Sequence, residues 1–276
     1  MDWMTAYKIP IGAWANTIFV WMKTNLSALF NIIADALEGL INGFLWLLQA
    51  PNPLVIIAIF VALAWVLQRN WKICVGVALG FLFVVNQGYW KETTESLTLI
   101  LSSCAVCMAI GVPIGIACAH NAKLNAALSP VMDLMQTLPT FVYLIPAIIF
   151  FGIGMVPGLI ATVIFVLPAP IRLTELGVAS TPTSLLEAAT AFGATPSQRL
   201  WKVELPWALP QIMVGLNQTI MLSLSMVVIA SMDGANGLGV PVMRALASVN
   251  AAKGFESGFV IVVVAIALRA TFQRKV

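Results

Sequence analysis

The sequence predicts an all-α, polytopic membrane protein, and three observations support that fold class. Hydrophobic residues make up 61% of the 276 residues, charged residues only 9%, and the mean hydropathy is +0.98, whereas about a quarter of a soluble domain is charged. The apolar runs are continuous, while the strands of a membrane β-barrel alternate apolar with polar residues. The net charge of +3 is too small and too scattered for a nucleic-acid surface or a disordered chain.

The membrane spans are located by the distances between charged residues, since a charge near the bilayer centre is costly. Uncharged stretches run over 39–68, 73–90, 96–122, 134–171, 205–232 and 257–268. A spanning helix needs about 20 residues. The stretch 134–171 is therefore divided at the glycine-rich residues 152–158, and 39–68 is divided at Pro51-Asn52-Pro53. The short last stretch is extended back to Phe255, with Arg269 reaching the interface.

These limits give about eight membrane helices. They are expected near residues 29–50, 54–68, 73–88, 96–118, 134–153, 157–177, 207–232 and 255–271. Ahead of them, aromatic residues between Lys8 and Lys23 indicate a helix that lies in the membrane interface. The chain is accordingly divided into an N-terminal interfacial segment (1–28), accessory membrane helices (29–92), a core (93–271) and a tail (272–276).

The basic residues orient this topology. Eight crossings place both termini on one side, and eleven of the 14 Lys and Arg residues fall on that side. Cytoplasmic loops are enriched in basic residues, so both termini are expected in the cytoplasm. The N-terminus has no basic segment followed directly by an apolar core, so a cleavable signal is not expected.

Several residues have ordinary structural interpretations. The four cysteines lie in apolar stretches, and Cys104 with Cys107 lacks the further ligands of a zinc site. Gly111 and Gly115 predict close helix packing. The lone histidine, His120, is expected to be exposed in a loop. The prolines expected to kink or interrupt their helices are Pro139, Pro146, Pro168 and Pro170.

The longest cytoplasmic segment, residues 178–206, is expected to hold two short helices. Ser184 and Glu187 have the spacing of a capping box, and Gly193 is a candidate helix stop. Residues 195–198 have the pattern of a second capping box. Such a helix pair is either a well-capped loop or a rigid projection on which a partner acts, and periodicity leaves both interpretations open.

The same segment resembles the EAA signature of ABC importer permeases. That signature is Glu-Ala-Ala, a glycine four residues after the second alanine, and a later Leu-Pro, found here in 187–193 and 198–206. Further runs are similar to permeases for glycine betaine, proline and choline, namely 130–146, 226–239 and 254–258. The resemblance covers about residues 5–268 and implies the type I ABC importer permease fold for residues 93–271.

The resemblance implies that this segment couples the chain to a separate cytoplasmic ATPase. The residues that would carry the coupling are Glu187, Ala188, Ala189, Gly193, Arg199, Leu205 and Pro206. The sequence contains no GxxxxGK[ST] phosphate-binding loop, so ATP would be used by the partner subunit. Neither a cofactor nor an enzymatic site is expected in this chain.

By the same resemblance, two copies of the chain would form the pore of an ATP-driven importer for glycine betaine or choline-like quaternary amines. Two ATPase subunits and a periplasmic or lipid-anchored substrate-binding protein would complete it in the bacterial inner membrane, with no nucleic acid bound. The alternatives are the same importer class carrying trimethylamine oxide, a sulfonium osmolyte or proline, and an ion-coupled secondary transporter. The last would be expected to show acidic residues at mid-membrane or internal repeats, and neither is apparent.

Polar residues within the spans either line a translocation path or join helices, and the sequence does not separate the two. The candidates for a path or gate are Asn217, Ser225, Asp233, Gln136 and Tyr143. Asp233 stands where the resemblance predicts an apolar residue, and it adds a charge near the outer mouth. Arg269 likewise lacks the aspartate that usually precedes it in the permeases that this chain resembles.

Overall fold

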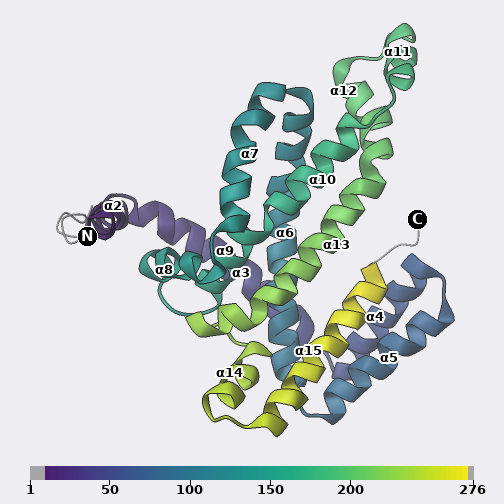
Figure 1. The fold of residues 1–276 in the computed structure, drawn as a ribbon. Coiled ribbons are helices and arrows are strands. Elements are labelled where there is room, and N and C mark those ends of the chain that lie inside the picture. The colour runs from purple at the N-terminus through teal and green to yellow at the C-terminus, as the bar shows by residue number, and fades with distance from the viewer. Residues whose placement is uncertain (1–9, 273–276) are drawn as a thin grey trace, which may run out of the picture.

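The computed structural model describes residues 10–272, and the regular elements in that range are helical (Figure 1). The first part of the chain forms α2 (Ile11–Asn25), α3 (Ser27–Gln49), α4 (Pro53–Gln68) and α5 (Trp71–Asn86). The middle forms α6 (Trp90–His120), α7 (Ala122–Thr137), α8 (Thr140–Phe151), α9 (Met155–Val166) and α10 (Pro168–Ala179). The last part forms α11 (Thr183–Ala191), α12 (Pro196–Arg199), the π-helix η1 (Leu200–Glu204), α13 (Leu205–Ala230), the 3-10 helix η2 (Ser231–Asp233), α14 (Gly239–Ala247) and α15 (Ala251–Phe272). Residues 1–9 of the expected interfacial segment and 273–276 of the expected tail lie outside the described residues.

Five segments of the described chain are long and apolar enough to cross a membrane. They are α3, α6, α9 together with α10, the segment Pro196–Asp233, and α15. The last is a helix of 22 residues, which confirms the span with the shortest uncharged stretch. α4 and α5 are apolar helices of 16 residues each, and they occupy the positions expected for the second and third spans.

The prediction of one continuous helix over 134–153 is wrong. The chain makes two helices there, α7 and α8, and they meet at an angle of 97°. Leu138 between them is extended, because the ring of Pro139 disfavours a helical conformation of the preceding residue. α7 also takes up residues that were expected in a loop. Counting the bent pair as one span gives the described chain up to six long spans.

α6 is the longest helix and packs against α3, α9, α10 and α13. Gly111 and Gly115 confirm the predicted close packing, since a Cβ on Gly115 would lie 2.6 Å from the carbonyl oxygen of Ile171 in α10. α10 begins with Pro168, at a position where a missing N–H is tolerated. Pro168 thus marks the interruption between α9 and α10 that was expected. The ring of Pro170 lies inside α10 against Gly111, so it fits α10 to α6 without ending that helix.

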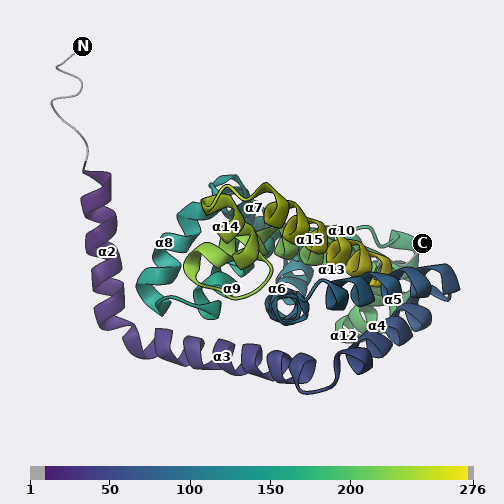
Figure 2. The same cartoon turned by 90° about the horizontal axis from the view of Figure 1, so that it is seen from below.

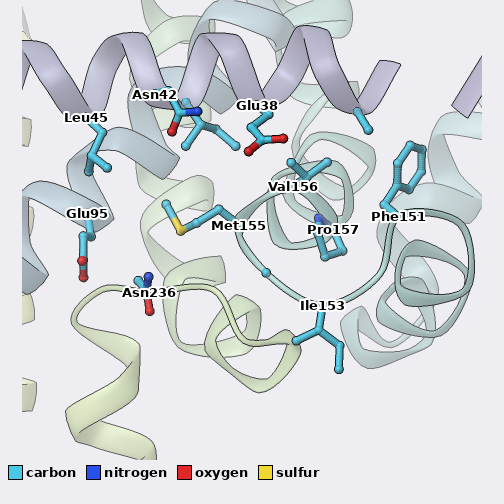
Figure 3. A pocket seen from close by; sticks show the side chains of 13 residues that line it. Glu38, Asn42, Leu45, Glu95, Phe151, Ile153, Met155, Val156, Pro157 and Asn236 are labelled. Carbon is cyan, nitrogen blue, oxygen red and sulfur yellow. The ribbon is translucent and has the colours of Figure 1, made fainter. Parts of the chain in front are cut away.

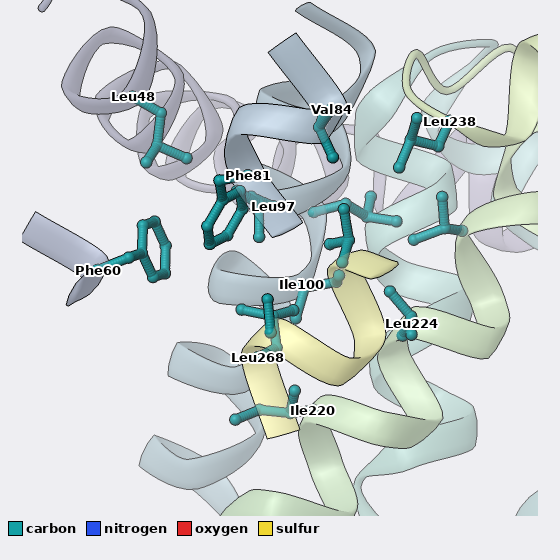
Figure 4. Packing of buried hydrophobic residues seen from close by; sticks show 14 of the residues in the cluster. Leu48, Phe60, Phe81, Val84, Leu97, Ile100, Ile220, Leu224, Leu238 and Leu268 are labelled. Carbon is teal, nitrogen blue, oxygen red and sulfur yellow. The ribbon is translucent and has the colours of Figure 1, made fainter. Parts of the chain in front are cut away.

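One hydrophobic cluster joins the first helices to the rest of the molecule (Figure 4). The rings of Phe60 in α4 and Phe81 in α5 have centroids 5.0 Å apart. They share this cluster with Leu97 of α6 and Leu268 of α15. Because these side chains are buried within protein, the α4–α5 pair belongs to the same folded body as α6 and α15.

α2 and α3 form an angled arm along one side of the molecule (Figure 2). Phe30 of α3 stacks on Phe150 of α8 with ring centroids 4.5 Å apart, and Phe19 of α2 meets the same ring edge-on at 5.8 Å. Most other side chains of α2 are exposed. Exposed aromatic and apolar side chains suit a lipid interface, and the interfacial location of α2 stays a prediction.

The helical hairpin formed by α11 and α12 lies at one end of the molecule, and α14 lies at the other (Figure 1). We call these the hairpin end and the α14 end. α6 and α13 run between them (Figure 1), so two long helices connect the two ends of the molecule.

Candidate functional site

The hairpin is shaped by local backbone signals. α11 ends at Ala191, and Gly193 adopts a φ of +76° that disfavours residues with a Cβ. The N–H of Gly193 donates to the carbonyl of Thr190 at 2.9 Å, and the N–H of Ala194 donates to that of half-buried Ala189 at 3.0 Å. These are the two bonds of a Schellman motif. The helix stop predicted at Gly193 is therefore confirmed.

The second predicted capping box is confirmed, and the first is wrong. Thr195 N donates to Gln198 Oε1 at 3.0 Å, while Gln198 N donates to Thr195 Oγ1 at 3.3 Å. Ser184 is not an N-cap, because α11 already begins at Thr183 after an extended Pro182. The Pro182 carbonyl accepts the first amides of the helix, which leaves Ser184 inside the first turn.

The hairpin and the η1 turn that follows it carry exposed and partly apolar side chains. Phe192 is 91% exposed, Trp201 is 67% exposed and Leu185 is 41% exposed. Glu187 and Ala188 on α11 are exposed as well. Large exposed apolar side chains are typical of interaction sites. We call these five residues the hairpin surface.

The base of the hairpin is fixed by a buried carboxylate. Glu204 of η1 is 1% exposed, and its Oε1 accepts a hydrogen bond from Arg199 Nε at 2.9 Å. Its Oε2 lies 2.7 Å from His120 Nε2, an ion pair when the imidazole is protonated. The His120 side chain is 41% exposed, as expected, but His120 ends α6 instead of lying in a loop. This three-residue cluster ties the hairpin to α6.

Leu205 and Pro206 begin α13 directly after Glu204. Leu205 packs against the buried cluster that contains Ala208 and Ile212, whereas Pro206 is exposed in the first turn, where its missing N–H is tolerated. The residues of the resembling signature therefore divide into an exposed part, 187–193, and an anchored part, 199–206.

The polar residues of α13 separate into two faces. Ser223 is buried, and Ser103 Oγ of α6 donates a hydrogen bond to its Oγ at 2.8 Å, so Ser223 joins helices. Thr219, one turn earlier, is buried as well. Asn217 is half-buried and Ser225 is exposed, and they lie two turns apart on another face. That face is the one suited to line a path.

The other path candidates do not join that face into a single site. Tyr143 is buried, and its hydroxyl donates to the Met135 carbonyl at 2.8 Å, so it holds the bend between α7 and α8. Gln136 is half-buried on α7. Asp233 is 2% exposed at the end of η2, and its backbone carbonyl accepts from Gly154 N at 2.9 Å. These three residues lie on separate elements, and none of them lines the pocket described next.

A pocket at the α14 end is not predicted by the sequence analysis (Figure 3). It has a volume of about 420 Å³ and is bounded by α3, α6, the connection from α8 to α9, and Asn236. Asn42, Glu38 and Glu95 supply further polar groups. In the sequence, the two glutamates mark only the limits of uncharged stretches. Their position beside apolar runs is the one signal that could have indicated the site.

Residues 111–273 match the model of a protein family described as "Binding-protein-dependent transport system inner membrane component". The glycine betaine/carnitine transport permease protein GbuB of Listeria monocytogenes is 44% identical over 94% of this chain and 93% of its own length. ProW of Escherichia coli, a glycine betaine/proline betaine transport system permease protein, is 40% identical over 94% of this chain and 73% of its own. TmoV of Ruegeria pomeroyi, a trimethylamine N-oxide transport system permease protein, is 31% identical over 94% of this chain and 41% of its own.

A solved structure of the MetNI methionine ABC transporter in an inward-facing conformation is also similar. The match covers 70% of this chain and 94% of that chain, with a TM-score of 0.61 at 24% identity. This likeness confirms the predicted type I importer permease fold. Since the family match extends over more than half of the sequence and GbuB aligns with nearly all of it, the chain belongs to the family of binding-protein-dependent transport system inner membrane components.

Proposed function

We propose that this chain is the permease subunit of an ATP-driven importer for glycine betaine and related quaternary amines. The cargo is supported by GbuB and ProW, whose names give glycine betaine and which are at least 40% identical over 94% of this chain. TmoV, named for trimethylamine N-oxide, is 31% identical, which makes that methylated amine the second candidate.

The hairpin surface is the observation that carries the coupling proposal. Phe192 and Glu187 are exposed on a hairpin whose ends are fixed by its own caps, and a rigid exposed helix fits a cleft in a partner protein. In the proposed assembly, two copies of this chain form the pore and each hairpin contacts one ATPase subunit. A separate binding protein delivers the cargo at the α14 end.

The orientation follows from the same assembly. The hairpin end faces the cytoplasm, which agrees with the bias of basic residues toward that side. Both termini then lie in the cytoplasm. Residues 93–271 serve as the permease core, and residues 29–92 serve as accessory helices that pack against it.

The cluster at Glu204 supplies the mechanical connection. When ATP draws the two ATPase subunits together, each hairpin moves with its subunit. Because Glu204 is held by Arg199 and faces His120, that movement reaches α13 directly and α6 through His120. The hydrogen bond between Ser103 and Ser223 keeps α6 and α13 together. Their joint rotation would open the pore alternately to the two sides.

Reconstitution of the permease with its ATPase and binding protein in proteoliposomes tests this function. We expect ATP-dependent uptake of radiolabelled glycine betaine and stimulation of ATP hydrolysis by the loaded binding protein. Phe192→Ala and Glu187→Ala should lower uptake and stimulated hydrolysis together by about tenfold, as expected at the centre of an interface. Phe255→Ala truncates an aromatic side chain that is 77% exposed on α15, and it should leave both within about twofold.

Three outcomes would contradict parts of this proposal. Uptake that persists without ATP would favour a secondary transporter. Equal effects of Phe192→Ala and Phe255→Ala would remove the role of the hairpin surface. Uptake of trimethylamine N-oxide without uptake of glycine betaine would keep the importer and replace its cargo with the second candidate.

A further inference from the structure

The pocket at the α14 end is framed by hydrogen bonds that fix its two loops (Figure 3). On one side, Gly154 N donates to the backbone carbonyl of Asp233 at 2.9 Å. On the other side, the buried N–H of Leu238 donates to Ser96 Oγ at 2.8 Å. Gly237 approaches so closely that a Cβ there would lie 2.5 Å from Ser96 Oγ. The start of α9 at Met155 and the loop that carries Asn236 are therefore held in place relative to α6.

Two carboxylates from different helices line this pocket, Glu38 of α3 and Glu95 of α6. Glu95 is only 9% exposed. Within residues 10–272, no hydrogen bond or ion pair joins its carboxylate to another side chain or to the backbone. Lys91, one turn earlier on α6, is exposed and lies beyond ion-pair distance, so it acts on Glu95 only as a more distant charge. A carboxylate on a mostly buried residue with no hydrogen-bond or ion-pair partner is stabilised by a cation that binds in the pocket beside it.

The rest of the lining indicates which kind of cation fits. Apolar walls are formed by Ile41, Leu45, Phe151, Met155 and Pro157. Hard metal ions such as Ca²⁺ need about six oxygen ligands around one point. In the part of the chain that the structure describes, no three His, Cys, Asp or Glu side chains come close enough to hold a metal ion. The lining instead suits a cation that is itself partly apolar.

We propose that this pocket binds the quaternary ammonium group of the cargo between its delivery and its entry into the pore. A methylated ammonium has no N–H to donate, so it is held by carboxylate charge and by packing of its methyl groups, and Phe151 offers an aromatic ring to it. The volume of about 420 Å³ lies in the range of small-molecule sites. The identity of the cargo rests on the proposed function, whereas the preference for a methylated ammonium rests on the lining.

The same lining predicts a rank order among methylated amines. Choline carries only a positive charge, while glycine betaine also carries a carboxylate that Glu38 and Glu95 repel. The amides of Asn42 and Asn236 can donate hydrogen bonds to that carboxylate, but they bring no positive charge. We expect tetramethylammonium and choline to bind more tightly than glycine betaine, and weak binding of glycine betaine suits a site through which cargo passes.

Calorimetric titration of tetramethylammonium into the full-length chain in lipid nanodiscs, without ATPase or binding protein, tests the proposal. We expect one site per chain. Glu95→Gln preserves the shape of the side chain and should weaken binding about tenfold or more. Glu38→Gln, on the exposed side of the pocket, should weaken it by a smaller factor. Asp35→Asn removes the same charge one turn away on α3, outside the lining, and should stay within about twofold.

Three results would overturn the pocket assignment. The first is competition with tetramethylammonium by Na⁺ or K⁺ at the same concentration as tetramethylammonium. The second is equal weakening of tetramethylammonium binding by Asp35→Asn and Glu95→Gln. The third is an unchanged affinity for tetramethylammonium in both Glu95→Gln and Glu38→Gln. Uptake by the complete importer reports on the proposed function separately. If the importer carried no quaternary amine while tetramethylammonium still bound through Glu95, the cargo would be wrong and the pocket assignment would hold.

Discussion

His120 at the end of α6 and Glu204 just before α13 face each other, with 2.7 Å between His120 Nε2 and Glu204 Oε2. They are 84 positions apart in the sequence, and Arg199 completes the cluster through its hydrogen bond to Oε1 of Glu204. A buried carboxylate requires such partners, because it loses its hydration on folding. The cluster thus joins the hairpin to the two longest helices of the described chain at one point.

Arg199→Ala should destabilise the protein by leaving Glu204 with a single partner. Removing one member of a buried pair costs about 3–5 kcal/mol, and the 35% exposure of the Arg199 side chain brings our expectation down to about 2 kcal/mol. This corresponds to a Tm lower by about 4–8 °C in a chain of this size, measured by thermal unfolding of the purified protein in detergent. Lys202→Ala removes the same charge from an exposed side chain and should change Tm by about 1 °C or less. Equal shifts in the two variants would contradict the role of the cluster.

Gly115→Ala should force α6 away from α10. The new Cβ would lie 2.6 Å from the carbonyl oxygen of Ile171 and 2.7 Å from Cβ of Thr174, and backbone atoms cannot rotate aside. Overpacking of this kind costs about 1–3 kcal/mol. Gly76→Ala in α5 is the matched control, because no atom lies within 4 Å of the position that its methyl group would take and a helical alanine is favoured over glycine by about 0.5–1 kcal/mol. Thermal unfolding should therefore shift in opposite directions, and a stable Gly115→Ala would show that the helices are not in close contact.

Ser96→Ala should loosen the loop before α14. The N–H of Leu238 is buried and would lose its acceptor, at a cost of about 1–3 kcal/mol. Hydrogen–deuterium exchange of residues 235–239 should become faster. Ser248→Ala removes a hydroxyl that bonds only within and just beyond its own helix, so exchange at 235–239 should stay as it is. Unchanged exchange in Ser96→Ala would mean that the loop is held by other contacts.

Tyr89, in the turn between α5 and α6, should make stability depend on pH in the alkaline range. Burial and the hydrogen-bonded carboxylate of Glu256 raise the pKa of Tyr89 above its usual value of 10.0. The folded state thus favours the neutral phenol, so its contribution is complete below pH 10 and is lost as the pH rises through the raised pKa. Tm measured against pH for the wild type and Tyr89→Phe should show a difference that shrinks above pH 10. A difference that is constant from pH 8 to 11 would contradict this.

Local signals predicted the parts of the fold that depend on neighbouring residues. Continuous apolar runs gave the spans, and the turn chemistry of Gly193 and residues 195–198 gave the hairpin. Pro139 was expected to kink or interrupt its helix, and the break between α7 and α8 confirms this, but the size of the bend was not predicted, since an apolar run on both sides of a proline has the same composition whether the chain continues or folds back. Ser184 failed as a cap because Pro182 occupies the N-cap position, two residues earlier.

Contacts between distant segments could not be predicted from the sequence. Ser223 and Asn217 look alike as polar residues in an apolar helix, and only the position of Ser103 on α6 shows that Ser223 joins helices. Glu95 likewise becomes a pocket residue only when α3 and the loop at Asn236 are placed around it. In both cases the information lies in tertiary packing and not in the residue type or its spacing.

Gly193→Ala should separate stability from coupling. Gly193 has a φ of +76° with open space around it, so an alanine meets no clash and incurs only the backbone cost of the left-handed conformation, about 1–2 kcal/mol. Because the hairpin is exposed, this strain should distort the Schellman motif while leaving the Tm of the membrane body nearly unchanged. Cargo-stimulated ATP hydrolysis by the reconstituted importer should fall about fivefold or more, since the strain destabilises by about 1–2 kcal/mol the hairpin conformation that contacts the ATPase.

Two control variants separate the backbone conformation from the added methyl group. Gly193→Asn should retain more of the stimulation than Gly193→Ala, because asparagine tolerates this conformation. Gly258→Ala in α15, with open space and an ordinary helical backbone, should retain all of it. Equal stimulation in Gly193→Ala and Gly258→Ala would show that the shape of the hairpin does not matter for coupling.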